Sequence, residues 1–68
     1  MKWLFLSYMN KVHIRSFREL SKETGIEYRT LLNHIEKPQC FRIFELVALD
    51  EVLRFSDEDM MRILRGRI

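Results

Sequence analysis

The feature that most constrains this chain is Gly25, which stands between two short amphipathic patterns. In both patterns, apolar and small residues recur at the three-and-four spacing that places side chains on one face of a helix. They are Phe17, Leu20, Ser21 and Thr24 before the glycine, and Leu31, His34 and Ile35 after it. The patterns lie too close together for anything but a tight turn, and glycine accepts a left-handed backbone there without a steric penalty. The sequence therefore predicts a helix-turn-helix.

This segment resembles the helix-turn-helix of the lambda-repressor and phage Cro family. Six residues have the spacing of that family's pattern, which consists of a small residue, a turn glycine and core aliphatic residues. They are Leu20, Ser21, Gly25, Ile26, Leu31 and Ile35. Ser21 stands where the family usually has alanine, and Glu27 stands where a serine or similar cap is common. With its flanking helices the resemblance covers most of the chain. It implies a compact, all-α, five-helix lambda-repressor-like domain that binds double-stranded DNA.

The length of the chain predicts one domain, residues 1–68, near the size at which a single core is marginal. Two glycines and one proline are too few for a chain of many turns, which favours helices. Cys40 is the only cysteine, so an internal disulfide is excluded, and no CxxC or His-x-x-x-His spacing suggests a metal site. We expect no metal, no cofactor and a location in the reducing cytoplasm.

The charge is distributed unevenly along the chain. Residues 1–42 hold eight Lys or Arg and four Glu, a net charge of +4. Residues 43–68 hold four Arg and six acidic residues, a net charge of −2. The positive part contains the helix-turn-helix, as DNA binding requires.

The most apolar stretch is residues 1–12, and its uninterrupted apolar run is only Trp3 to Leu6. A bilayer span needs roughly 20 residues, so we expect neither a membrane helix nor a targeting segment. We predict a first helix in which Phe5, Met9 and Val12 face the core. A strand from Trp3 to Met9 is a weaker alternative.

Four further apolar side chains of this helix cannot all share that core-facing stripe. They are Trp3, Leu4, Leu6 and Tyr8. Two interpretations remain open: a small core wraps around the helix from several directions, or these side chains form a dimer or partner surface.

The other helix boundaries are marked by local signals. Ser16, with Glu19 three residues later, predicts a capping box at the start of the second helix. Pro38 predicts that the helix after the turn ends near Glu36. Ser56 predicts the start of a last helix that is complete by about Arg65 and points Met60, Ile63 and Leu64 inward.

The segment Phe41 to Arg54 contains enough apolar residues to form the main packing helix. They are Ile43, Leu46, Val47, Leu49, Val52 and Leu53. We expect this helix to supply much of the core.

Catalytic chemistry is not expected. Only His13, His34 and Cys40 have nucleophile or general-base character near neutral pH, and their spacing does not bring them together on one element. His34 is expected to be packed or partly exposed on the inward side of its helix, and Cys40 to be half-buried in a loop. We predict a non-enzyme without a small-molecule ligand.

The helix after the turn is expected to enter the major groove and to present its N-terminal residues and outer face to base edges. Those residues are Glu27, Tyr28, Arg29, Leu32, Asn33 and Glu36. Arg29 suits guanine, Asn33 suits adenine, Leu32 can meet a thymine methyl, and Glu27 can accept from cytosine N4. Tyr28 suits a base or a phosphate. The expected phosphate contacts are Arg15, Arg18, Lys22, Lys37 and Arg42.

We therefore expect a small Cro-like transcriptional repressor or regulator that acts on DNA as a homodimer. The alternative is a protein-interaction module, for example an antitoxin-like partner protein, that keeps the helix-turn-helix shape and binds through its apolar first helix.

Overall fold

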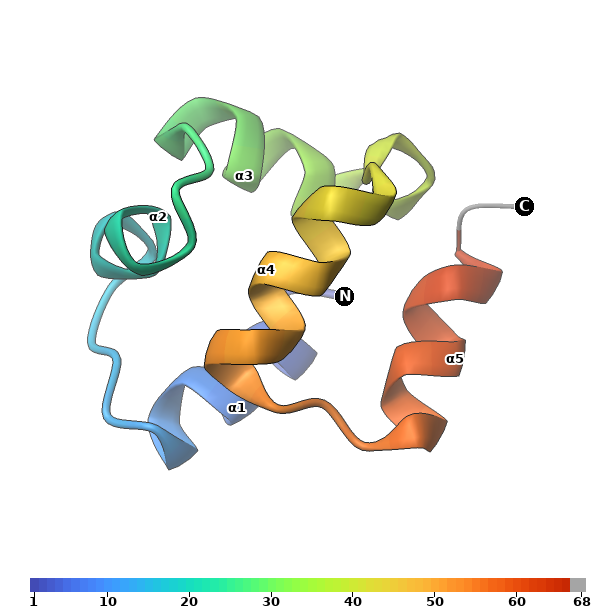
Figure 1. Ribbon diagram of the computed structural model, residues 1–68, viewed down its shortest axis with the longest axis horizontal. Coiled ribbons are helices and arrows are strands. Elements are labelled where there is room, and N and C mark those ends of the chain that lie inside the picture. Colours follow the sequence, from blue (N-terminus) through green and yellow to red (C-terminus); the bar gives the residue numbers. More distant parts are fainter. Residues whose placement is uncertain (67–68) are drawn as a thin grey trace.

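A computed structural model describes residues 1–66 of the chain, and within that range every regular element is helical. The elements are α1 Lys2–Lys11, α2 Phe17–Thr24, α3 Tyr28–Glu36, the 3-10 turn η1 Pro38–Cys40, α4 Ile43–Leu53 and α5 Asp57–Arg65 (Figure 1). The all-α, five-helix prediction is confirmed, and the strand alternative for Trp3 to Met9 is wrong because these residues lie in α1. In the described range no helix has the length and apolar character needed to cross a membrane.

Aromatic side chains from three parts of the chain meet in the core. The ring of Phe5 on α1 stacks on that of Phe41, with ring centroids 5.9 Å apart, and meets the edge of Phe55 at 5.6 Å. Tyr8 packs edge-on against Phe55 at 4.9 Å. Since Phe41 and Phe55 lie in the connections on either side of α4, these contacts tie α1 to both ends of the central helix.

The buried face of α1 is wider than its periodicity predicts. Leu4 and Tyr8 are buried with Phe5 and Met9, so their assignment to a dimer or partner surface is wrong. Tyr8 lies between the ring of Phe55 and the start of α5, which covers a side of the helix that the sequence pattern leaves open. The interpretation that the core wraps around α1 is therefore correct for Leu4 and Tyr8. Trp3 and Leu6 remain exposed.

The buried face of α4, in contrast, is narrower than the sequence predicts. Leu46, Leu49 and Leu53 are buried, as expected, but Ile43 and Val47 are exposed. The helix carries hydrophobic residues around more of its circumference than the other helices cover, so some must face solvent.

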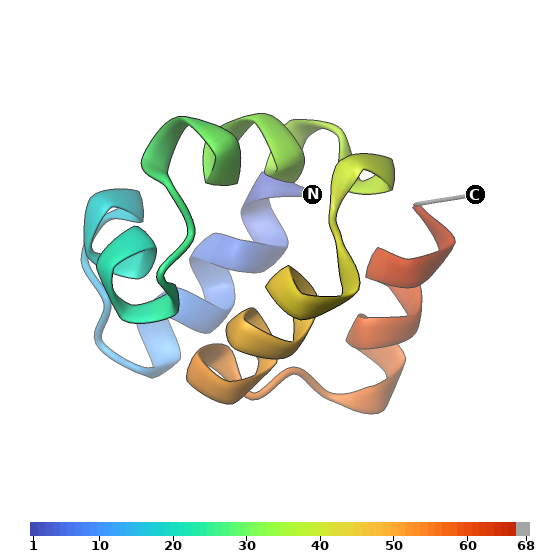
Figure 2. The ribbon, with the colours of Figure 1, turned by 45° about the horizontal axis from the view of Figure 1, so that its top comes forward.

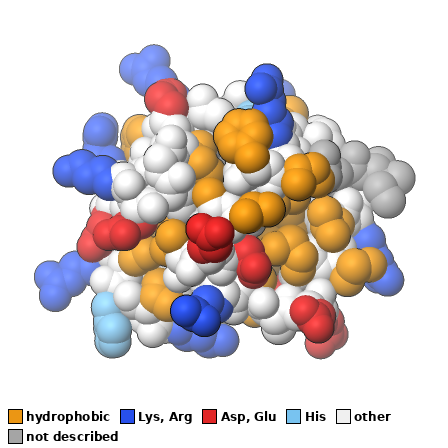
Figure 3. Space-filling view, viewed as in Figure 1, with side chains coloured by type: hydrophobic (Ala, Val, Ile, Leu, Met, Phe, Trp, Pro, Cys, Tyr) orange, Lys and Arg blue, Asp and Glu red, His pale blue; other side chains and the backbone are white. Residues whose placement is uncertain are grey.

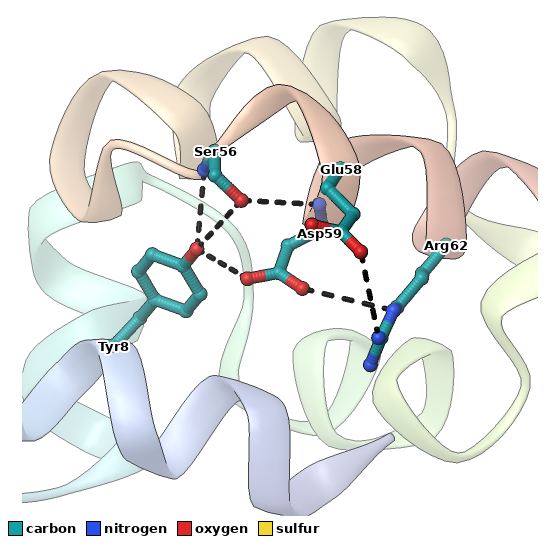
Figure 4. Close-up of polar contacts among 5 residues, drawn as sticks. All are labelled: Tyr8, Ser56, Glu58, Asp59 and Arg62. Atoms are coloured by element: carbon teal, nitrogen blue, oxygen red, sulfur yellow. Dashed lines mark hydrogen bonds and ion pairs between the residues drawn. The ribbon is translucent and has the colours of Figure 1, made fainter.

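The side chain of Tyr8 fastens α1 to the beginning of α5 (Figure 4). Its hydroxyl donates a hydrogen bond to the carboxylate of Asp59 and accepts one from the backbone N–H of Ser56 at 3.1 Å. Ser56 is the N-cap of α5, as predicted, and its Oγ accepts from the N–H of Asp59 at 3.1 Å. One tyrosine thus secures both the cap and the first turn of the last helix.

This arrangement predicts a loss of stability in acid. The hydrogen bond from Tyr8 is the main cause that holds the pKa of Asp59 below its usual value of 3.8, with smaller contributions from Ser56 and Arg62. Because the folded pKa is depressed, the stabilisation is present above about pH 4 and is lost as the pH falls through the lowered folded value. Urea unfolding between pH 7 and pH 2 measures this loss. The variant Asp59→Asn cannot titrate and should show a shallower pH dependence; an identical dependence would contradict the assignment.

Candidate nucleic-acid interface

The turn between α2 and α3 is built on the left-handed backbone of Gly25, whose φ is 75°. Its N–H donates to the carbonyl of Ser21 at 2.9 Å and so ends α2. A methyl group added at this glycine would meet no atom within 4 Å. The requirement for glycine therefore comes from the backbone conformation and not from crowding.

Two hydroxyl groups of α2 hold the turn in place. Ser21 Oγ donates to the carbonyl of Ile26, and Thr24 Oγ1 donates to the carbonyl of Leu20 at 2.8 Å. Thr24 Oγ1 also accepts a hydrogen bond from the backbone N–H of Ile26, whose nitrogen is 3.3 Å away. Ile26 itself is buried in the core. The hydroxyl of Ser21 therefore satisfies a backbone carbonyl within the turn.

The start of α2 differs in one detail from the predicted capping box. Ser16 Oγ accepts from the N–H of Glu19 at 3.1 Å, as predicted. The carboxylate of Glu19, however, accepts from the N–H of Arg15 at 2.9 Å and not from that of Ser16. The cap of α2 therefore extends one residue further upstream, to Arg15, than the capping-box motif predicts.

The two faces of α3 have opposite environments. On its inner face Leu31 and Ile35 are essentially fully buried. Its outer side lies at the edge of the molecule, where no other helix of residues 1–66 covers it (Figures 1 and 2). A shallow depression of about 360 Å³ lies on this side, and it is lined by Arg29, Leu32, Asn33 and Glu36. The structure thus brings together four of the six residues expected to face base edges. The helix that carries them is anchored in the core by its buried inner face.

Glu27 caps the N-terminus of α3. Its carboxylate accepts from the N–H of Arg29 at 2.6 Å and lies 3.4 Å from the hydroxyl of Thr30. A negative charge at this position stabilises the first turn of a helix. Glu27 therefore has a capping role in α3, and contact with a base would compete with that role.

Tyr28 and Arg18 form a pair at the same end of α3. The guanidinium of Arg18 lies over the ring of Tyr28, with its central carbon 4.3 Å from the ring centroid. This cation–π contact joins the first turn of α2 to the first turn of α3. It places a predicted phosphate contact beside a predicted base contact, although the two are ten residues apart in the sequence.

The remaining predicted phosphate contacts are all exposed. They are Arg15, Lys22, Lys37 and Arg42. Lys37 is the C-cap of α3 and Arg42 the N-cap of α4, so these two lie in the connection that leaves α3. Within residues 1–66 no side-chain hydrogen bond or ion pair ties Arg15 or Lys22 to α3.

Lys2 is not among the predicted DNA contacts, although it lies beside α3. This residue lines a small cavity with Leu32 and Glu36 of α3, and its ammonium lies 5.8 Å from the ring centroid of Phe17. It adds a cation beside the C-terminal half of α3. No sequence signal could have identified it, because only the packing of α1 brings position 2 next to position 32.

His34 joins α3 to α4, as a packed histidine. Its Nδ1 lies 3.1 Å from Oε1 of Glu45, and its ring meets the edge of Phe41 at a centroid distance of 5.5 Å. Glu45 is buried, and the same oxygen accepts from the N–H of Arg42 at 2.8 Å. The hydrogen bonds of this buried carboxylate are therefore structural.

The other two residues considered for catalysis, His13 and Cys40, are both exposed, so the expectation of a half-buried thiol is wrong. The 3-10 turn that contains Cys40 is only three residues long and buries none of its side chains. In the described part of the chain no three His, Cys, Asp or Glu side chains gather as a metal site would require.

Comparison with known proteins identifies no relative: no family model, no curated protein and no solved structure matches the chain.

Proposed function

We propose that this protein binds double-stranded DNA sequence-specifically by inserting α3 into the major groove, and that it is a small Cro-like, lambda-repressor-like transcriptional regulator of the cytoplasm. The observation that carries the proposal is the contrast between the faces of α3. Two fully buried aliphatic residues anchor its inner face, while Arg29, Leu32 and Asn33 share one open depression on its outer side. Rigid support with exposed polar side chains is what recognition of base edges requires.

The chemistry of the three outer residues suits base recognition. The guanidinium of Arg29 can donate two hydrogen bonds to O6 and N7 of guanine, and the amide of Asn33 can pair with N6 and N7 of adenine. The two residues are four apart, and therefore one above the other on the helix. Leu32 lies beside them in the depression and offers an apolar contact to a thymine methyl.

Cations near both ends of α3 support contacts with the two flanking phosphate backbones. Arg18 stands at the N-terminal end and is held there by Tyr28, while Lys37 and Lys2 lie toward the C-terminal end. A guanidinium that already rests on an aromatic ring loses less side-chain freedom when it meets a phosphate. We infer that Arg18 is the strongest of the phosphate contacts.

Neutralising a true phosphate contact should weaken binding to all duplexes alike. For Arg18→Gln and Lys37→Gln we expect the slope of log K against log salt to fall by about one unit each, because each contact releases about one counterion. Fluorescence anisotropy over a salt series measures the slope. The matched control is Arg54→Gln, at the end of α4 that is remote from α3, and its slope should equal that of the unmodified protein. Unchanged slopes for Arg18→Gln and Lys37→Gln would contradict the assignment.

The experiment that tests the proposal itself is selection from random duplex DNA with the purified protein. We expect enrichment of a short site that contains guanine and adenine at positions consistent with Arg29 and Asn33. The proposal would be rejected if the selection enriched no site and the protein's only binding was insensitive to salt.

A protein-interaction module remains the second candidate function, and one observation favours it. Trp3 and Leu6 expose large apolar side chains on α1. A partner bound through them would form a complex that salt scarcely weakens, whereas a complex with DNA weakens steeply as salt rises.

A further inference from the structure

Helix α3 has one carboxylate at each end, and their surroundings differ. The carboxylate of Glu27, just before the first turn, accepts from the backbone N–H of Arg29 at 2.6 Å and caps the helix. Glu36 is the last residue of the helix and is exposed. Within residues 1–66 no side-chain hydrogen bond or ion pair engages its carboxylate. Of the two, Glu36 is therefore the one whose oxygens are available to accept a hydrogen bond from a ligand.

Glu36 also lies near the middle of the outer face of α3. Since an α-helix turns by about 100° per residue, the direction of Glu36 differs from that of Arg29 by only about 20°. Asn33 and Leu32 lie on either side of Glu36, each within about 60° of it. All four residues line the same shallow depression. A duplex that meets Arg29 and Asn33 along α3 therefore meets Glu36 as well.

This position is unfavourable for a carboxylate that has no specific use. The C-terminal end of a helix carries a partial negative charge, so a negative side chain in the last turn lowers the stability of the helix. A carboxylate on a surface that faces DNA also repels the phosphates. Lys2 lines a small cavity together with Glu36, but no ion pair joins the two side chains in the described range. A residue that violates two local preferences at once indicates a functional role.

A carboxylate distinguishes the bases because it can only accept hydrogen bonds. In the major groove cytosine presents a donor at N4, whereas guanine presents acceptors at N7 and O6, and thymine presents an acceptor at O4. Adenine presents a donor beside an acceptor, which suits an amide better than a carboxylate. Over guanine or thymine a carboxylate would lose its water without gaining a hydrogen bond. A glutamate at this place in the interface therefore selects cytosine and rejects the other bases.

We propose that Glu36 reads a cytosine and is a specificity-determining residue of α3, a role that Glu27 does not have because it caps the helix. This inference rests on the proposed function, since it assigns one more base to the same helix. At 1.5 Å per residue, Glu36 lies about 4.5 Å beyond Asn33 and about 10.5 Å beyond Arg29 along the axis. Base pairs are about 3.4 Å apart, so the cytosine is expected roughly one base pair beyond the adenine and three beyond the guanine.

The test is selection from random duplex DNA with the unmodified protein, Glu36→Gln and Glu36→Ala. Glutamine has nearly the same length as glutamate and suits adenine, so Glu36→Gln should change the preferred base at this position from cytosine to adenine. Glu36→Ala should have no preference there. In both variants the ratio of the affinities for the cytosine site and for its adenine substitution should fall at least about tenfold. The preferences assigned to Arg29 and Asn33 should not change.

Two further variants make the same change of charge elsewhere. Glu51→Gln alters an exposed residue of α4, a helix that does not line the depression and over which hydrophobic side chains gather (Figure 3). It should change binding to random duplex less than about twofold, whereas Glu36→Gln should strengthen that binding at least about threefold. Glu27→Gln should keep the cytosine preference and melt at a lower temperature, because it weakens the cap. Glu36→Gln should melt no lower than the unmodified protein, as followed by circular dichroism.

The outcomes separate this inference from the proposed function. If the unmodified protein selects a site and both Glu36 variants keep its base preferences, the inference is overturned and the proposed function stands. A selected site without cytosine at the expected position would overturn the inference in the same way, and so would a cytosine preference that Glu27→Gln removes and Glu36→Gln retains. If the unmodified protein selects no site, both are rejected.

Discussion

Truncating Leu31 to alanine is expected to lower the free energy of unfolding by about 2–5 kcal/mol, most of the stability available to a domain of this size. Leu31 is 0% exposed, lies on the inner face of α3 and belongs to the hydrophobic core. The removed atoms leave a cavity that the surrounding helices can fill only in part. Urea unfolding followed by circular dichroism measures the change. DNA binding should fall only in proportion to the unfolded fraction.

The chain offers a matched control in the next residue. Leu32 has the same side chain on the same helix, but it is only half-buried, so Leu32→Ala should cost less than about 1.5 kcal/mol. That variant should instead lose affinity at one base pair while it remains folded. If Leu31→Ala and Leu32→Ala destabilised the protein equally, the assignment of inner and outer faces to α3 would be incorrect.

Removing both polar side chains from the outer side of α3 should have the opposite effect. Arg29→Ala and Asn33→Ala remove no buried contact, so each should change stability by no more than about 0.5 kcal/mol. Each lost bidentate contact is expected to weaken binding by about 1–3 kcal/mol at one base pair. The double variant should therefore bind its selected site roughly 30-fold to 20,000-fold more weakly, with its melting almost unchanged. Anisotropy titrations on the selected site and on its single-base substitutions measure both affinity and preference.

Arg29→Lys provides the control for charge. Lysine keeps the positive charge but cannot present the planar fork that pairs with guanine. We expect this variant to keep the salt slope of the unmodified protein and to lose its preference at one position. Unaltered affinity and base preference in Arg29→Ala and Asn33→Ala would contradict the proposed role of α3 and favour the protein-interaction module.

The helix boundaries could be predicted because the signals that set them are local. Ser16 and Ser56 cap helices through hydrogen bonds to residues three positions later, and Pro38 follows the end of α3. Gly25 ends α2 with a left-handed backbone, as its position in the turn predicts. Each of these signals acts within one turn of the chain, so tertiary contacts are not needed to interpret it.

The solvent-facing surfaces could not be predicted equally well. Periodicity gives the relative angles of side chains around a helix axis, but not which directions another helix will cover. On α1, Tyr8 is buried because α5, almost fifty residues later, begins beside its hydroxyl. On α4, Val47 is exposed because the residues that cover the helix stop short of that side. Exposed apolar side chains therefore lie on α4 and α5 as well as on α1.

The sequence by itself determined the all-helical class, the tight turn at Gly25, the ends of the helices and the opposite faces of α3. All of these follow from backbone preference, capping and periodicity, which involve residues close together in the chain. Only the tertiary structure decided that Arg18 rests on Tyr28, that Lys2 lies beside Leu32, and that an apolar surface remains open on α4 and α5. Such placements depend on how the helices pack against one another, and a contact between distant positions exists only once the core has brought them together.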